Sequence, residues 1–237
     1  LNKKDPFWME KTIDWRRLAE VTQILVRFMD NVVDANWYPD PQIKEKTLLT
    51  RKLGLGVMGF ADVLYSLQVK YGSPESLAIA EKFGAAIYRA AQDASIQLAK
   101  ERGNFPAWEA SIYKESGIPM RNATLTCIAP TGSISLICDV SAGIEPNFAL
   151  AYTKTVMDGT VLSYIHPEVL RLLAPLASSS TEDKFIQEIP KLVAKHAPWL
   201  VTTHQVSVEE HVRMQATWQK YTDSAVSKTI GLPYTAT

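Results

Sequence analysis

The chain has 237 residues, with 25 Lys and Arg balanced by 25 Asp and Glu, so its formal net charge is zero. Nothing in this net charge calls for nucleic acid or an acidic membrane surface as a partner, and no apolar run approaches the roughly 18 residues of a membrane span. Two cysteines cannot build a disulfide framework, and no signal peptide is visible in the given sequence, so we expect a cytoplasmic protein with neither a nucleic-acid nor a membrane partner.

The first part of the chain predicts helices. Asp14 can cap a helix that ends by Asn36, and a second helical stretch covers residues 43–53. Ser73 and Pro74 form a good helix start, and a long helix follows to Arg102, where Gly103 suits the C′ position. Residues 104–121 read as a connection with at most a short helix.

The later part of the chain predicts both strands and helices. The predicted elements are strands at 124–129, 148–156 and 225–230, a turn at Asp158-Gly159, helices at 167–173 and from 182, and a helix from Val208 to about 223 that starts in the capping box Ser207-Val-Glu-Glu210. The polar loop 178–181 should cap the helix from 182, and Pro190 should interrupt it. We expect one segment, 1–237, without an internal linker; it begins without Met and stops just after a strand-like run, which suggests truncation at both ends.

The stretch around Pro130 carries the strongest chemical signal. Pro130 should end the strand at 124–129, and the small hydroxylic residues Thr131, Ser133 and Ser135 then surround Gly132 before an apolar run. A strand, a glycine turn and a helix start aim free backbone N–H groups at an anion, and the hydroxyls add further donors. We interpret this turn as a phosphate cradle; the alternative is an ordinary turn with a helix cap. No lysine follows the glycine, so it is not a Walker loop.

A second glycine pattern, Gly54-x-Gly56-x-x-Gly59, has the spelling of a dinucleotide-binding fingerprint. That fingerprint needs a preceding strand and an acidic residue about 20 positions later. The preceding residues here are charged and helix-like, and residues 78–80 are Ala-Ile-Ala. We therefore favour a packing role for these glycines, with a nicotinamide-dependent dehydrogenase as the weakest alternative.

Other reactive residue types give weaker signals. The histidines, at 166, 196, 204 and 211, lack the spacing of a zinc helix and are expected at the surface or as caps. Cys127 comes just before Pro130, so it could neighbour a ligand held by the turn, although a free cysteine is more often a small buried hydrophobe.

Three runs in the chain resemble one known family. Residues 122–135, N-A-T-L-T-C-I-A-P-T-G-S-I-S, followed by Gly143-Ile-Glu-Pro146, resemble the large catalytic chain of ribonucleotide reductases, most of all the adenosylcobalamin-dependent class. Residues 51–62 and 215–230 resemble flanking stretches of that family in the same order. Gly231 departs from the family, which usually carries asparagine there.

The resemblance implies a fold, a reaction and a site. The fold would be α/β, a helix-rich portion of a ten-stranded α/β barrel. The complete enzyme would remove the ribose 2′-hydroxyl of a ribonucleoside di- or triphosphate through a thiyl radical generated with adenosylcobalamin, with electrons from a thiol reductant such as thioredoxin. Its radical cysteine corresponds to a position before Leu1, so no catalytic residue is assigned here. The residues implied in substrate phosphate binding are Pro130, Thr131, Gly132, Ser133, Ile134 and Ser135, with Glu145 beside them.

Two functional hypotheses follow. In the first, the chain is part of a reductase that acts together with the remaining part of the reductase chain. In the second, it is a non-catalytic nucleotide-binding or regulatory subunit that associates with the chain bearing the catalytic cysteine. Both place the phosphate-binding turn in this segment, and the sequence does not separate them.

Overall fold

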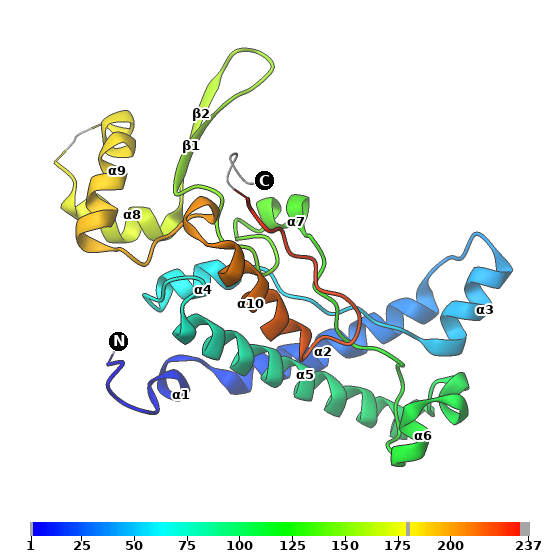
Figure 1. Cartoon of the computed structure of the whole chain (residues 1–237). Helices are drawn as coiled ribbons and strands as arrows, with labels where there is room; N and C mark the ends of the chain where they lie inside the picture. The colour runs from blue at the N-terminus through cyan, green and yellow to red at the C-terminus, as the bar shows by residue number, and fades with distance from the viewer. Residues whose placement is uncertain (1, 179–180, 233–237) are drawn as a thin grey trace. The chain divides into compact units, whose positions relative to one another are not determined.

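A computed structural model of the chain describes residues 2–178 and 181–232 (Figure 1). These residues form two compact units. The first unit comprises residues 2–56, 79–129 and 216–227, and the second comprises residues 57–78, 130–178, 181–215 and 228–232. Each unit therefore draws on several separate stretches, so no single linker divides the chain, and the sequence shows none.

Helices dominate the described residues. In chain order they are α1 (Trp8–Thr12), α2 (Trp15–Ala35), α3 (Pro41–Thr50), α4 (Phe60–Ser66), α5 (Pro74–Arg102), η1 (Pro106–Ala110), α6 (Ile112–Ser116), α7 (Gly132–Ile137), α8 (Pro167–Leu173), η2 (Ala174–Leu176), α9 (Glu182–His196), η3 (Thr203–Gln205) and α10 (Val208–Gln219). The strands β1 (Ala151–Thr155) and β2 (Val161–Ile165) form an antiparallel hairpin. None of these helices combines the length and the apolar character that a membrane span requires.

Local capping signals confirm the predicted helices of the first unit. The Asp14 carboxylate accepts a hydrogen bond from the Arg17 amide at 2.9 Å at the start of α2. α5 ends where Gly103 takes a φ of +83°, a conformation that glycine adopts without steric cost. α3 ends at Thr50, earlier than predicted, because Arg51 turns into the left-handed region with φ of +47°. Residues 104–121 contain two short helices, η1 and α6, where at most one was predicted.

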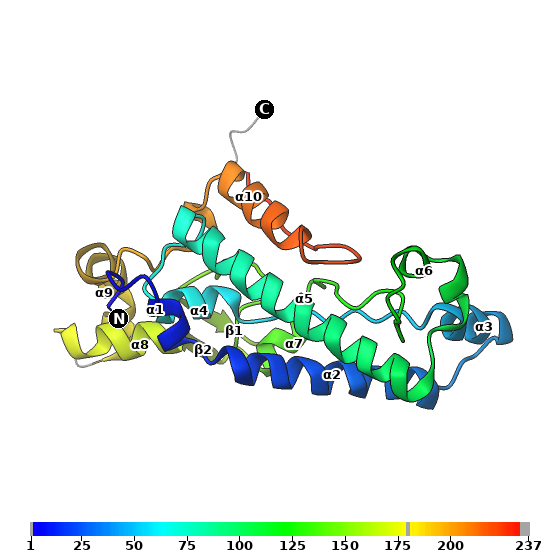
Figure 2. The same cartoon turned by 90° about the horizontal axis from the view of Figure 1, so that it is seen from below.

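Helices α2 and α5 lie side by side and run in the same direction (Figure 2). The rings of Trp15 and Phe83 are 5.0 Å apart near one end, and Arg27 donates to Glu101 at 2.8 Å near the other. Their facing sides bury the apolar core of the first unit, which includes Val26, Val33, Ala91, Leu98, Phe105, Met120 and Leu125.

A buried ionic cluster crosses this core. The Asp30 carboxylate, fully buried, accepts hydrogen bonds from Arg51 at 2.7 Å, Arg102 at 3.0 Å and Asn122 at 3.0 Å. Burial raises the pKa of Asp30, but the hydrogen bonds from Arg51 and Asn122 outweigh it, and the pKa lies below its usual value. The cluster ties α2 to residues that are distant in sequence.

The strands predicted at 124–129 and 225–230 are extended segments with single bridges rather than regular strands. Thr126 pairs in parallel with Leu55, and Ile128 pairs in parallel with Val226. The ladder is interrupted because the Asp223 carboxylate accepts the amide hydrogens of Leu125 and Thr126 at 2.7 and 3.3 Å. A side chain thus takes two amides that a regular strand would give to a neighbouring backbone. This role of Asp223 also places it outside α10, which ends at Gln219.

The second unit confirms most of its predicted boundaries. β1 lies inside the predicted strand 148–156, the Asp158-Gly159 turn joins it to β2, and α8 matches the predicted helix. The Ser207 hydroxyl and the Glu210 carboxylate form the predicted capping box of α10. Of the predicted loop 178–181, residues 179 and 180 lie outside the described residues, and the side chain of Thr181 makes no capping hydrogen bond.

The predicted interruption at Pro190 is wrong. α9 continues through Pro190 from Glu182 to His196. Proline removes one backbone donor and crowds the preceding turn, which disfavours a helix interior. Here Phe185 and Ile189, on the buried face of α9, pack into a core with Tyr65, Val169, Leu173 and Leu200. The burial of this apolar face stabilises the helix on both sides of the proline.

Candidate functional site

The turn at residues 130–135 leads directly into a helix, as predicted. Thr131 has a φ of +51°, which is uncommon for a residue with a side chain, and α7 begins at the next residue. The Thr131 hydroxyl accepts a hydrogen bond from the Gly143 amide at 2.8 Å, so it anchors a second loop rather than capping α7. The first-turn amides of a helix have no partner within it and are available to an anion.

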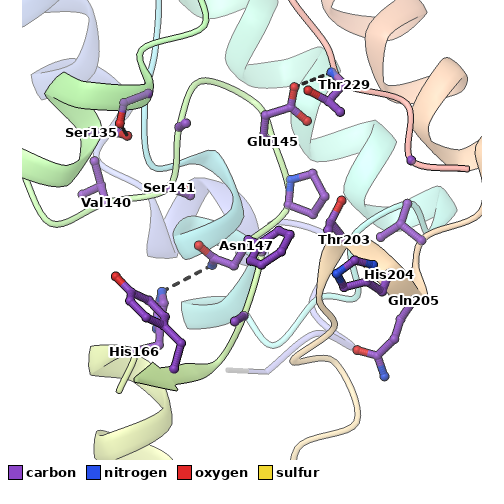
Figure 3. Close-up of a pocket in the computed structure, with 18 of the residues that line it drawn as sticks. Ser135, Val140, Ser141, Glu145, Asn147, His166, Thr203, His204, Gln205 and Thr229 are labelled. Atoms are coloured by element: carbon purple, nitrogen blue, oxygen red, sulfur yellow. Dashed lines mark hydrogen bonds between the residues drawn. The ribbon is translucent and has the colours of Figure 1, made fainter. Parts of the chain in front are cut away.

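An open cleft of about 1110 Å³ lies beside this turn, within the second unit (Figure 3). Its wall is formed by α7 and the loop after it, the start of the hairpin, the turn η3, and the final described residues. The lining comprises Gly132, Ser135, Leu136, Asp139, Val140, Ser141, Ala142, Glu145, Pro146, Asn147, Phe148, Ala149, Tyr152, Tyr164, His166, Thr203, His204, Gln205, Val206, Ser207, Val208, Thr229, Gly231 and Leu232. A volume of this size is at or above the upper end for small-molecule sites, which is about 1,000 Å³.

The structure brings three of the sequence-predicted site residues to this cleft. Gly132, Ser135 and Glu145 line it, and a Cβ on Gly132 would meet open space. The Ser135 hydroxyl is buried and donates to the Gly132 carbonyl oxygen at 3.1 Å, so its proton is already engaged.

The other predicted residues are not in the lining. Pro130, Thr131, Ser133 and Ile134 belong to the same turn and helix but do not line the cleft. Cys127 lies in the first unit, where its thiol donates to the Ala225 carbonyl oxygen at 3.5 Å. Its expected nearness to a ligand stays a prediction.

Glu145 is held by a buried lysine. Its Oε2 accepts from Lys228 Nζ at 2.5 Å. Its Oε1 accepts from the Thr229 amide at 2.6 Å, the hydrogen bond drawn in Figure 3. The Lys228 side chain has no solvent exposure, whereas Glu145 keeps 23%. Burial lowers the pKa of Lys228, and the hydrogen bond and charge of Glu145 raise it in part.

His211 completes this cluster. Its Nδ1 accepts from Lys228 Nζ at 2.8 Å, and its ring is fully buried. Burial, followed by the positive charge of Lys228, lowers the pKa of His211, so the ring is neutral near pH 7. The expectation that His211 lies at the surface or caps a helix is therefore wrong.

A second polar cluster, Asp62–His166–Asn147, reaches the cleft through Asn147 and His166, which line it. His166 Nε2 is 2.9 Å from Asp62 Oδ1, and Asn147 donates to the same oxygen at 3.0 Å. His166 Nδ1 accepts from the Glu168 amide at the start of α8, so Nε2 carries the proton given to Asp62. Burial raises the pKa of Asp62, but the hydrogen bonds from His166, Asn147 and Ser141 lower it below its usual value. His166 is thus the cap that the sequence predicted, and it is also buried.

Sequence reasoning missed Lys228, His211 and Asp62 as residues of the site region. For Lys228 a signal was present, because alternate residues of an extended segment share a face and Val226 is buried. For Asp62 and His211 no local pattern distinguishes them from surface residues. Among the described residues, no group of three His, Cys, Asp or Glu side chains could hold a metal ion.

Comparisons with known proteins agree on one family. The sequence matches the ribonucleotide reductase barrel domain over residues 3–120 and 114–237. It is 44% identical to a vitamin B12-dependent ribonucleoside-diphosphate reductase of Thermoplasma acidophilum, over 96% of this chain and 30% of that protein. It is 42% identical to the protein of the same name from Mycobacterium tuberculosis, over 95% of this chain and 33% of that protein.

A more distant relative carries a related name. The chain is 28% identical to a ribonucleoside-diphosphate reductase subunit alpha of Chlamydia pneumoniae, over 91% of this chain and 25% of that protein. The chain therefore spans about a third or less of the length of the curated relatives it matches.

Proposed function

Because the chain belongs to the ribonucleotide reductase barrel-domain family, we propose that it is part of the catalytic chain of a vitamin B12-dependent ribonucleotide reductase. The complete enzyme would convert ribonucleotides to deoxyribonucleotides. The names of the relatives support ribonucleoside diphosphates as the substrates. The remaining part of the reductase chain is the first expected partner.

The role of this segment in that reaction would be to hold the substrate phosphate. The single observation that carries the proposal is the open approach to the N-terminus of α7, where Gly132 lines the cleft and presents no side chain. Backbone amides at a helix start attract anions through their free hydrogens and the helix dipole. Within residues 130–135, Gly132, Ser133 and Ile134 would supply these amides and Thr131 and Ser133 the free hydroxyl protons. Pro130 has no N–H, and Ser135 donates both its amide and its hydroxyl hydrogen inside the turn. The unusual backbone of Thr131 aims the turn and is consistent with a functional constraint.

The cleft also has room and chemistry for more than a phosphate. Leu136, Phe148 and Tyr152 give it an apolar side, of the kind against which a large flat group such as a corrin ring can pack, so the lining is compatible with adenosylcobalamin. When bound, that cofactor would supply the radical. The contribution of this chain's own residues would be to bind and orient the nucleotide and to exclude water.

The remaining needs of the reaction fall outside the described cleft. Among the described residues that line the cleft there is no cysteine. The reacting thiols would therefore come from other parts of the enzyme, and a thiol reductant such as thioredoxin would restore them. Cys127 and Cys138 are both free, which agrees with a reducing cytoplasm.

The test is nucleotide binding to the full reductase chain that carries this segment. Gly132→Val puts a branched side chain into the space where the phosphate should sit, and we expect roughly a 10- to 150-fold loss of affinity with an unchanged melting temperature. Ile137→Val, on the exposed side of the same helix and outside the cleft lining, is the matched control and should bind normally. If Gly132→Val binds substrate as tightly as the parent, the turn is only a helix start.

A further inference from the structure

The charges that line the cleft are unfavourable for a phosphate. Among the described residues of the lining, the formally charged side chains are Asp139 and Glu145, with neither lysine nor arginine beside them. The Asp139 carboxylate accepts a hydrogen bond from the Tyr164 hydroxyl at 3.1 Å. A nucleoside diphosphate entering such a cleft meets two carboxylates, and like charges repel each other.

The ammonium group of Lys228 compensates the charge of Glu145 from behind the wall of the cleft. Lys228 Nζ donates to Glu145 Oε2 at 2.5 Å, to His211 Nδ1 at 2.8 Å and to the Thr229 carbonyl oxygen at 2.6 Å. An ammonium has three hydrogens, so these three acceptors use all its donors. Because its side chain is buried, Lys228 cannot itself reach a ligand in the cleft.

Of the three groups that accept a hydrogen bond from Lys228, Glu145 is the one that carries a charge. His211 is neutral near pH 7, since burial and the charge of Lys228 both lower its pKa. The Thr229 carbonyl oxygen is neutral as well. Glu145 in turn uses both carboxylate oxygens, one for Lys228 and one for the Thr229 amide. This arrangement fixes residue 229, which itself lines the cleft.

We infer that Lys228 is a positioning residue of the substrate cleft, whose buried ammonium cancels the charge of Glu145 and fixes Thr229 in the wall, so that a nucleoside diphosphate can bind there. This inference deepens the proposed function and rests on it. Lys228 acts through Glu145, and it does not touch the substrate.

A purely structural role would give a different result. If Lys228 only holds the segment 228–232 against the wall, its loss should weaken every ligand of the cleft equally. If it cancels the charge of Glu145, its loss should weaken phosphorylated ligands selectively, and removal of Glu145's charge should relieve the effect. A double-mutant cycle separates these two roles.

The experiment measures binding of a ribonucleoside diphosphate and of the matching unphosphorylated ribonucleoside to the full reductase chain. Lys228→Met should weaken diphosphate binding by about tenfold or more relative to the nucleoside, because an uncompensated carboxylate remains in the wall. The double variant Glu145→Gln/Lys228→Met should recover most of that selective loss. Equal losses for both ligands, or no recovery in the double variant, would overturn the inference.

A second variant covers the case in which Lys228→Met does not fold. Glu145→Gln removes the negative charge while its amide oxygen can still accept from Lys228. Its NH2 group cannot accept from the Thr229 amide, so thermal melting checks that the wall keeps its fold. The variant should tighten diphosphate binding relative to the nucleoside, by roughly tenfold or less. Selective weakening of the diphosphate in this variant would overturn the inference. The Gly132→Val result is independent of this cycle, so failure of the phosphate-binding turn and failure of the Lys228 role can be told apart.

Discussion

Gly56 and Cys127 approach so closely that a Cβ on Gly56 would overlap the carbonyl oxygen of Cys127. A Cβ added to Gly54 would lie 3.2 Å from the Cβ of Cys127, which is a tight contact but not an overlap. The parallel bridge between Leu55 and Thr126 sets this approach. The two glycines therefore form a natural pair of test positions.

We predict that Gly56→Ala destabilises the reductase chain by about 3 kcal/mol or more, the upper part of the range for overpacking, because a paired backbone cannot move aside. Gly54→Ala should cost about 1 kcal/mol, the lower end of the same range, since a shift of a few tenths of an ångström relieves the 3.2 Å contact with the Cys127 Cβ. Chemical denaturation of both variants measures the difference. Equal losses at the two positions would contradict the close approach at Gly56.

The same geometry bears on the dinucleotide fingerprint. A fingerprint glycine lets a pyrophosphate approach the backbone, but at Gly56 the Cys127 carbonyl already occupies that place. We predict that calorimetric titration with NAD(H) shows no binding that depends on Gly56. Micromolar binding that is lost in Gly56→Ala but kept in Gly54→Ala would revive the dehydrogenase hypothesis.

The hydroxyls of the phosphate-binding turn should differ in their effects. Ser133→Ala should weaken nucleotide binding roughly 10- to 150-fold if that hydroxyl makes a charge-assisted hydrogen bond. Ser135→Ala should instead lower the free energy of unfolding by about 1 kcal/mol, because the buried Ser135 hydroxyl donates its one proton to the Gly132 carbonyl oxygen. Binding and melting measured on both variants test this; a loss of stability in Ser133→Ala alone would reverse the assignment.

The buried carboxylate of the first unit should dominate its stability. Asp30→Asn removes the buried carboxylate that Arg51 shares with Arg102, while Asp34 still pairs with Arg51 at 2.7 Å, so we expect a loss of about 3 kcal/mol, the lower end of the range for a broken buried ion pair. Asp93→Asn, a change of the same kind at an exposed position, should cost less than about 0.5 kcal/mol. Urea denaturation of the two variants provides the comparison.

The same residue predicts a pH dependence. The pKa of Asp30 is lower in the folded state than its unfolded value of about 3.9, so the unfolded state binds more protons in that range. Its contribution to stability is fully present above the unfolded pKa and is lost as the pH falls through the folded pKa. Asp30→Asn should therefore flatten the acid limb of the stability profile, and an unchanged limb would show that other carboxylates govern it.

The 237-residue chain by itself should show no reductase activity, because no thiol lines the described cleft. The assay is deoxynucleotide formation with adenosylcobalamin and a dithiol, with the full reductase chain as the positive control. Turnover by the 237-residue chain alone would sink the proposal that the reacting thiols come from elsewhere.

Elements with local signals could be predicted from the sequence. Some signals act on backbone groups only a few residues away, so neighbours in sequence suffice to place them. They are Asp14, the Ser207 capping box, Pro167 and the Asp158-Gly159 turn. The family could also be recognised, because three runs occur in the order typical of it. These signals led to the turn at Gly132 and to Glu145 as its neighbour in the cleft.

Tertiary structure alone decided the rest. α9 continues through Pro190 because its apolar face is buried, and the expected strands near Thr126 shrink to bridges because Asp223, distant in sequence, takes their amides. The charge at the cleft depends on Glu145 meeting Lys228, which is 83 residues away. No local propensity encodes such a meeting: the burial that makes the pair strong exists only once the chain has folded around it.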